Sequence, residues 1–303
     1  MPETAALSLL RSSRAIGYLF SGGATRTIFQ VGVVETLDAL GIRPSMCLGV
    51  SAGAWNAAAV AVGNLHRLRP YWRFFVRMPA IDVTNLLREH SPFAWSRLHE
   101  RAFNRYVGNE RIKSADTLPL LVALSRLRDK QQVIFDVREA ADPFRLLLAS
   151  NYLPPFYTHP LDVEGERYGD GGWTNSIPYE GLFARGCDAV VLMASKGESE
   201  GGLYRHPDDY EHVIAPEYRD RVVVFRPRHR MPLNFVERRW SKVSPIADLG
   251  AFRAREVLLG ERYAQTDLAA TGRALSEHLV AVRDLARKAA VWRRRPPHPE
   301  SHS

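Results

Sequence analysis

The sequence predicts an α/β fold, a three-layer α/β/α sandwich with a mostly parallel central sheet. Short runs rich in β-branched and aromatic residues alternate with longer runs of helical period, and no internal repeat is visible. A chain that alternates in this way builds a parallel sheet with helices on both faces. Turns rich in small residues follow the first two predicted strands, and ligands in such folds bind at the carboxyl ends of strands.

The first predicted elements form a strand, helix, strand unit. Residues 16–20 predict a strand, and apolar residues at helical spacing predict a helix over 27–40 that Gly41 ends. The residues at that spacing are Ile28, Val31, Val34 and Leu37. A second strand follows at 46–48, so the two strands should be parallel neighbours joined by a right-handed crossover.

The rest of the chain continues the alternation. An extended segment is predicted from near Pro160 to Asp170, and residues 249–285 have helical period. Further strands are predicted at 132–137, 188–194 and 221–225. We therefore expect a single domain over residues 1–290 that includes outer C-terminal helices at about 249–290. A disordered, basic, proline-rich tail is expected at 291–303.

Composition indicates a globular protein with a basic surface. The chain has 303 residues, of which 46% are hydrophobic and 24% charged, and 41 Lys and Arg against 33 Asp and Glu give a formal charge of +8. Such a surface suits acidic ligands or anionic lipid, or is a solvated helix face. No recognition motif indicates nucleic acid.

The cysteines and the lengths of the apolar runs indicate which kinds of protein this chain is not. Cys47 and Cys187 lie in apolar runs, which predicts buried free thiols, and neither a disulfide framework nor a metal site is indicated. We expect no metal and no cofactor. The first residues have no signal-peptide pattern, and no apolar run approaches the roughly 20 residues of a membrane span. We expect a cytoplasmic protein. Peripheral contact with a membrane surface is left open.

The turn after the second strand has the sequence of a nucleophile elbow. Gly49-Val50-Ser51-Ala52-Gly53 places a serine between two glycines, after an apolar run and before an alanine-rich helix. The turn is sharp, so its neighbours must be small, and the serine hydroxyl is left free at the end of the strand. The positive end of the helix that follows favours negative charge at that point.

The turn after the first strand contains small residues that free their backbone amides. In Ser21-Gly22-Gly23-Ala24-Thr25-Arg26, the amides can converge on an anion, either a phosphate or an oxyanion. The spacing matches neither the Rossmann motif nor the P-loop, and no lysine is present. Because the first two strands should be neighbours, an oxyanion hole facing Ser51 is the better interpretation.

An acidic residue among glycines is the third candidate. Asp170 lies in Tyr168-Gly169-Asp170-Gly171-Gly172, at the end of the extended segment. A carboxylate there is a candidate base for the serine, provided that partial desolvation raises its basicity. A plain Asp-Gly turn is the alternative interpretation.

Together, the three motifs resemble the patatin-like phospholipase family, whose sequences read S-G-G-G-x-R-G, then G-x-S-x-G, then D-G-G/A followed by asparagine and proline. Here the last motif is followed by Asn175 and Pro178, and Ala149-Ser150 with Pro154-Pro155 precede it as in the family. The resemblance covers about residues 15–195.

The resemblance implies a metal-independent serine esterase that acts on lipid acyl esters such as phospholipids or lysophospholipids. It implies a dyad of Ser51 and Asp170 without histidine. The amides of Gly22, Gly23 and Ala24 are then the oxyanion hole, and the supporting residues are Arg26, Gly49, Gly53, Gly171 and Gly172. Substrate headgroup, chain length and oligomeric state do not follow from it.

Two departures from the family pattern keep alternatives open. Ala24 replaces a glycine, and Thr27 replaces the glycine after the arginine; a positive φ at Ala24 would cost about 1 kcal/mol. A hydrolase fold that binds lipid or acts as a scaffold without activity is one alternative. Another is an α/β-hydrolase triad that uses a late histidine. The late histidines are His206, His212, His229 and His278.

An aromatic and basic insertion is expected at about residues 66–110. It includes residues 70–78 and 93–95, with Trp72, Phe75 and Trp95. Three interpretations are open: a cap over an acyl pocket, a contact with an anionic membrane surface through Trp72 and Phe75, or buried helix faces.

Overall fold

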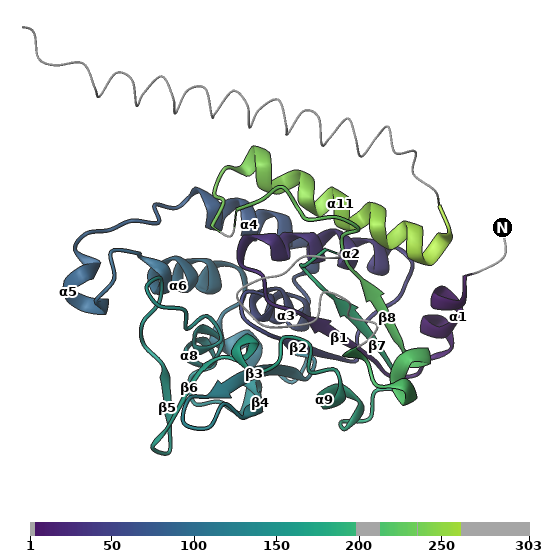
Figure 1. Ribbon diagram of the computed structural model, residues 1–303, viewed down its shortest axis with the longest axis horizontal. Coiled ribbons are helices and arrows are strands. Elements are labelled where there is room, and N and C mark those ends of the chain that lie inside the picture. The colour runs from purple at the N-terminus through teal and green to yellow at the C-terminus, as the bar shows by residue number, and fades with distance from the viewer. Residues whose placement is uncertain (1–3, 198–212, 235, 262–303) are drawn as a thin grey trace, which may run out of the picture. The chain divides into compact units, whose positions relative to one another are not determined.

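The computed structural model describes residues 4–197, 213–234 and 236–261 (Figure 1). Met1–Glu261 forms one compact unit, and Arg262–Ser303 is a second unit that lies outside the described residues. The predicted boundary at residue 290, the late part of the predicted C-terminal helices and the predicted tail therefore also lie outside them.

One mixed sheet organises the fold. Its order is β5-β6-β3-β2-β1-β7-β8, with β4 paired to β3. The parallel pairs are β1-β2, β1-β7, β2-β3 and β7-β8, and the other three pairs are antiparallel. The strands are β1 Ile16–Phe20, β2 Met46–Gly49, β3 Leu120–Arg126, β4 Gln132–Asp136, β5 Leu161–Val163, β6 Glu166–Asp170, β7 Ala189–Met193 and β8 Val222–Phe225. The predicted α/β fold with a mostly parallel sheet is confirmed.

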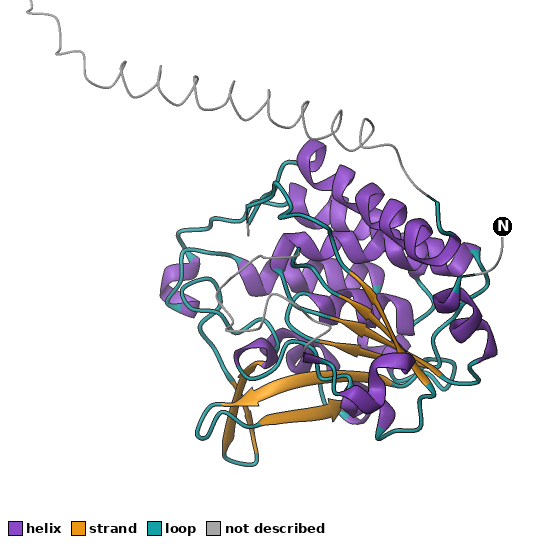
Figure 2. Ribbon diagram, turned by 45° about the vertical axis from the view of Figure 1, so that its right-hand side comes forward, coloured by secondary structure: helices purple, strands orange, loops and turns teal. Residues whose placement is uncertain are grey.

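Helices cover the sheet unequally. Figure 2 shows most of them gathered on one side of the parallel strands. That side holds the larger core, to which Tyr18 and Phe20 of β1 contribute, whereas Leu19 between them packs in a second core with Leu182 of α9. The helices are α1 Ala5–Ser12, α2 Ile28–Ala39, α3 Gly53–Ala61, α4 Leu68–Arg77, α5 Asn85–Glu89, α6 Trp95–Tyr106, α7 Asn109–Ile112, α8 Pro143–Ala149, α9 Glu180–Phe183 and α11 Trp240–Leu259.

The central strand β3 was not predicted. Its residues, Leu-Leu-Val-Ala-Leu-Ser-Arg, are buried along nearly their whole length, and a strand buried on both faces has no alternating pattern. The strand predicted at 132–137 is β4, an antiparallel partner of β3. The predicted extended segment before Asp170 is the hairpin of β5 and β6.

Helix α11 begins earlier than the helix predicted there, and it packs against the core instead of lying outside it. It starts at Trp240 instead of near residue 249 and lies against α2. A Cβ on Gly32 of α2 would overlap the backbone at Ala247, and a Cβ on Gly250 would overlap the carbonyl of Phe29. Glycine at both positions lets the two backbones approach, so α11 belongs to the core layer.

Two further expectations concern thiols and the membrane. Cys47 and Cys187 are free and buried, as predicted. In the part of the chain that the structure describes, no helix is both long enough and apolar enough to span a bilayer.

Candidate active site

Ser51 lies on a strained turn between β2 and α3. Its φ of 54° is in the left-handed region, and its backbone N–H donates to Ser150 Oγ at 2.6 Å. A Cβ on Gly49 would overlap the backbone of Ala54, and one on Gly53 would overlap the carbonyl oxygen of Phe20. The two glycines of the motif are therefore required for the close passage of the chain at the predicted elbow.

The loop after β1 lies beside Ser51. β1 and β2 are paired so that Phe20 is opposite Gly49, which brings the residues that follow them to the same edge. A Cβ on Gly22 would lie 2.9 Å from the Cβ of Ser51. Within residues 4–197, 213–234 and 236–261, no oxygen accepts a hydrogen bond from the amides of Gly22, Gly23 or Ala24. The three amides therefore have no acceptor among the described residues, and the contact of Gly22 places their loop beside the serine.

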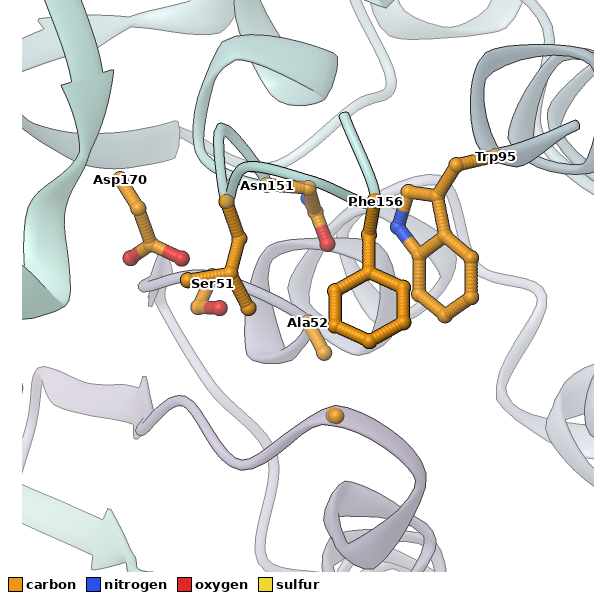
Figure 3. A pocket seen from close by; sticks show the side chains of 8 residues that line it. Ser51, Ala52, Trp95, Asn151, Phe156 and Asp170 are labelled. Atoms are coloured by element: carbon orange, nitrogen blue, oxygen red, sulfur yellow. The ribbon is translucent and has the colours of Figure 1, made fainter. Parts of the chain in front are cut away.

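The register of β3 places Asp170 and Ser51 at the same edge of the sheet. Gly49 is opposite Val122 of β3, and Asp170 is opposite Leu124 of the same strand. Ser51 comes two residues after Gly49, so it follows β2 at about the level of Leu124, and both Ser51 and Asp170 line one pocket. Figure 3 shows the Asp170 carboxylate on the same side of the pocket as the Ser51 side chain.

Asp170 is held in place by the glycines that follow it. The carboxylate is 1% exposed, and its Oδ1 accepts the N–H of Gly172 at 2.8 Å. A Cβ on Gly171 would overlap the carbonyl oxygen of Ala123 in β3. The Asp-Gly-Gly sequence thus fixes the carboxylate by one amide and one close backbone contact.

A small pocket joins the predicted residues. Its volume is about 20 Å³, which is room for about one water molecule. The lining residues are Ala24, Ser51, Ala52, Trp95, Asn151, Leu153, Phe156 and Asp170. Sequence reasoning missed Asn151, Leu153 and Phe156 as part of the site, although Ala149-Ser150 and Pro154-Pro155, which lie beside them in the chain, were part of the family resemblance.

A comparison with family models adds to this geometry. The model of the patatin-like phospholipases matches residues 18–183, more than half of the chain. The chain belongs to the patatin-like phospholipase family. The match runs from within β1 to beyond the Asp170 motif, so all three motifs lie within it.

Individual relatives of this family member are distant. It is 26% identical over 199 residues to Lysophospholipase NTE1 of Saccharomyces cerevisiae and 25% identical over 198 residues to the protein of that name from Candida glabrata. Both matches cover 62% of this chain but only 11% of the relatives' length. VipD from Legionella pneumophila has a similar fold, with a TM-score of 0.50 and 13% identity over 81% of this chain and 67% of that one.

The departure from the family pattern at Ala24 has a structural cost. Its φ is 50°, a conformation that costs a residue with a Cβ about 1–2 kcal/mol. A glycine at this position would remove the strain but would also raise the conformational entropy of the unfolded chain, which offsets about 0.4–1 kcal/mol of the gain in stability. We expect Ala24→Gly to raise the free energy of unfolding by about 0.5–1 kcal/mol, measured by urea titration. Ala52→Gly is the control, because Ala52 has a φ of −59°; a loss of stability in both variants would contradict the assignment of strain to Ala24.

A buried polar network holds the loop that carries the three amides. The Gln30 side chain donates to the carbonyl oxygens of Ser21, at 2.8 Å, and Met193, at 3.0 Å. Asn56 donates to Gln30 Oε1 at 2.8 Å and to the carbonyl oxygen of Thr27 at 2.9 Å. Trp72 Nε1 completes the network by donating to Asn56 Oδ1 at 2.9 Å. The network ties both ends of the loop to α2, α3 and α4.

Trp72→Phe should lower the free energy of unfolding by about 1–2 kcal/mol, because it leaves Asn56 Oδ1 buried without its donor. Tyr71→Phe is a matched control on the same helix. The Tyr71 hydroxyl is buried without a hydrogen-bond partner among the described residues, so its removal should leave stability unchanged or higher. Urea titration of the two variants checks this, and equal losses would argue against the network.

The aromatic insertion combines two of its three interpretations. Trp72 and Phe75 are each 3% exposed, so the interpretation as buried helix faces is correct for α4 and the prediction that these two side chains touch a membrane is wrong. Trp95 lines the pocket, which agrees with the capping interpretation. Helix α4 is therefore amphipathic, with its buried aromatic side chains facing the core and the exposed Arg73 and Arg77 facing outward.

Arg26 and His229 are not among the residues that line the pocket. Arg26 is half-buried, and its backbone N–H donates to the carbonyl oxygen of Gly23 at 3.1 Å, within the loop. His229 is exposed. No histidine is among the residues that line the pocket. His206, His212 and His278 fall outside the described residues.

Proposed function

We propose that this protein is a lipid acyl hydrolase of the phospholipase A or lysophospholipase type, with Ser51 and Asp170 as its catalytic dyad. The observation that carries the proposal is the pocket that Ser51 and Asp170 line together with Ala24 of the loop, in which Gly22 lies against Ser51. Family membership supports a lipid ester as substrate. The apolar side chains of Trp95, Leu153 and Phe156 also line the pocket.

In the proposed reaction, Ser51 Oγ attacks the ester carbonyl carbon while its proton passes to Asp170. The amides of the loop donate to the tetrahedral oxyanion, and each such donor contributes about 3 kcal/mol to transition-state stabilisation. When the C–O bond to the leaving alcohol breaks, the alcohol oxygen takes the proton from Asp170. Water then gives a proton to Asp170 and attacks the acyl-Ser51 ester. The fatty acid leaves, and the serine regains its proton.

Peripheral contact with an anionic membrane is part of this proposal. The formal charge of +8 favours association with anionic lipid surfaces. The substrate would be reached at such a surface instead of in solution.

Labelling with a fluorophosphonate probe tests the proposed nucleophile. We expect peptide mapping to place the adduct on Ser51, and hydrolysis of a medium-chain chromogenic ester to proceed in the presence of a chelator. Ser51→Ala should lose both. An adduct on another serine, or ester hydrolysis that persists in Ser51→Ala, would overturn the proposal. A panel of phospholipids and lysophospholipids then separates the two substrate classes.

A further inference from the structure

Exposed apolar side chains gather on one segment of the molecule. We call residues 79–93, which include α5, the arm. Ile81, Val83, Leu86 and Leu87 of the arm are 66%, 74%, 54% and 89% exposed. Among the other described residues, the exposed large apolar side chains are those of Val236 and Phe252, which are only 38% and 36% exposed. Figure 1 shows α5 at the left edge of the molecule, beyond α4 and α6.

The arm has defined structure at its base. Two backbone hydrogen bonds join its two ends, each 2.9 Å long: Asp82 N–H donates to the carbonyl oxygen of Pro92, and Ala94 N–H donates to that of Ala80. The Asn85 side chain, 2% exposed, donates across the arm to the carbonyl oxygen of Phe93 at 2.7 Å. The apolar side chains are thus held in water by an ordered segment, and an ordered apolar surface of this kind marks an interaction site.

The arm is continuous with the wall of the pocket. Ser91 Oγ donates to the carbonyl oxygen of Pro155 at 2.5 Å, and the rings of Phe93 and Phe156 lie 4.7 Å apart. Phe156 lines the pocket, and so does Trp95, which follows the arm directly in the chain. The base of the arm therefore adjoins residues that line the pocket.

The charges near the arm are those that suit an anionic surface. Helix α4, which leads into the arm, contains no acidic residue and carries the exposed Arg73 and Arg77 on its outer side. Asp82 of the arm is neutralised by Arg97, with 2.6 Å between Oδ2 and Nη1. Apolar side chains beside arginines form the pattern of segments that bind at the surface of anionic membranes.

A lipid surface fits the shape of the arm better than a folded protein does. Stable protein interfaces bury about 800 Å² on each partner, over roughly 20–30 residues. The exposed large apolar residues of the arm are four. Leu86 and Leu87 on α5 and Val83 in the turn before it form the tip, and Ile81 lies at the base. Such a tip is suited to insertion among lipid headgroups.

We propose that Ile81, Val83, Leu86 and Leu87 insert into the surface of an anionic phospholipid bilayer and so place the Ser51 pocket at that surface. This inference rests on the proposed function for its purpose, but the binding step itself requires no catalysis. The two are therefore separately testable.

Co-sedimentation with vesicles tests the insertion in the Ser51→Ala protein, so that no lipid is consumed. The vesicles are phosphatidylcholine with phosphatidylglycerol, compared with phosphatidylcholine alone. We expect the double variant Val83→Ser, Leu87→Ser to bind the anionic vesicles at least about tenfold more weakly. The matched control Phe252→Ser removes an apolar side chain from α11 and should bind as the parent does. Unchanged binding in the double variant would overturn the proposal.

Two further measurements separate lipid insertion from misfolding of the variant and from self-association. Leu87→Cys, labelled with an environment-sensitive dye, should shift to the blue on anionic vesicles; the natural Cys47 and Cys187 are buried. No shift would count against insertion even if the double variant failed to fold. Self-association in sedimentation velocity that disappears in the double variant would instead assign the arm to a second copy of the chain and overturn lipid insertion.

Activity separates this inference from the proposed function. In the protein with Ser51 intact, the double variant should hydrolyse a soluble chromogenic ester at the parental rate and lose activity only on vesicle lipid. If Ser51→Ala does not abolish hydrolysis but the arm variant still loses vesicle binding, the proposed function fails and the inference about the arm stands.

Discussion

Asp170→Asn should lower kcat/KM for carboxylic esters by about 10³-fold or more, with the fold intact. The amide has the shape of the carboxylate, and its oxygen still accepts the N–H of Gly172, whose bond to Oδ1 is 2.8 Å long. What it lacks is the basicity to take the proton of Ser51. The expected loss is therefore chemical, and thermal unfolding should show little change.

The comparison with Ser51→Ala makes this result specific. If the two side chains act as one unit, the double variant should be no less active than either single variant. Asp162→Asn is the control, because Asp162 lies in β5, is exposed and does not line the pocket. Steady-state hydrolysis of a chromogenic ester measures all the variants. Near-parental activity of Asp170→Asn would show that another group takes the proton.

Acid should destabilise the protein through His99. Its imidazole is 3% exposed and stacks on Trp55 at 4.5 Å, and neither ring nitrogen has a hydrogen-bond partner in the described part of the chain. Burial, with a further contribution from the charge of Arg238, lowers the pKa of His99 from 6.5 to about 3. The unfolded chain therefore binds a proton near pH 6.5 that the folded protein refuses until near pH 3.

The stability held by neutral His99 is complete above pH 6.5 and is lost as pH falls from 6.5 toward 3. At about 1.4 kcal/mol per pH unit, the loss by about pH 4.5 is roughly 3 kcal/mol. Glu237 and Asp129, whose pKa values are lowered to about 2 by hydrogen bonds from arginines, lose their contributions only below their ordinary values of 4.5 and 3.8. The window from pH 4.5 to 6.5 thus reports on His99.

Urea titrations across this window check the prediction. His99→Leu should remove most of the decline, and at pH 7 it should be at least as stable as the parent, because it removes two unpartnered polar atoms from the core. His66→Leu, which changes an exposed histidine, should follow the parental curve. An equally steep decline in His99→Leu would mean that other groups cause the acid sensitivity.

Local sequence located the motifs of the candidate site because each motif contains a steric requirement of a few adjacent residues. The Gly49 and Gly53 positions border a turn where a Cβ would overlap the backbone, and Gly171 does the same against β3. Such requirements are written in contiguous residues. The first strand, residues 16–20, was also predicted with its observed bounds, because its turn and helix signals lie beside it.

The parts that could not be predicted depend on residues distant in the chain. The positive φ angle of Ala24 depends on how its loop is held by the Gln30 side chain and by β7. Trp72 and Phe75 share a helix with exposed arginines, and only the packing of α3 and α6 shows that their side is the inner one. Amphipathic spacing locates two faces but does not say which one a neighbour covers.

By itself, the sequence determined the α/β class, the family and the three motifs, since these rest on local spacing and on the small residues that tight turns demand. The tertiary structure alone decided that Asp170 and Ser51 line one pocket, because β2 and β6 pair with adjacent stretches of β3, a strand whose continuous apolar run carries no periodic signal. It also decided which apolar residues are exposed, moving the expected surface contact from α4 to the arm. Strand register and burial are set by contacts between distant segments, and such contacts exist only in the folded chain.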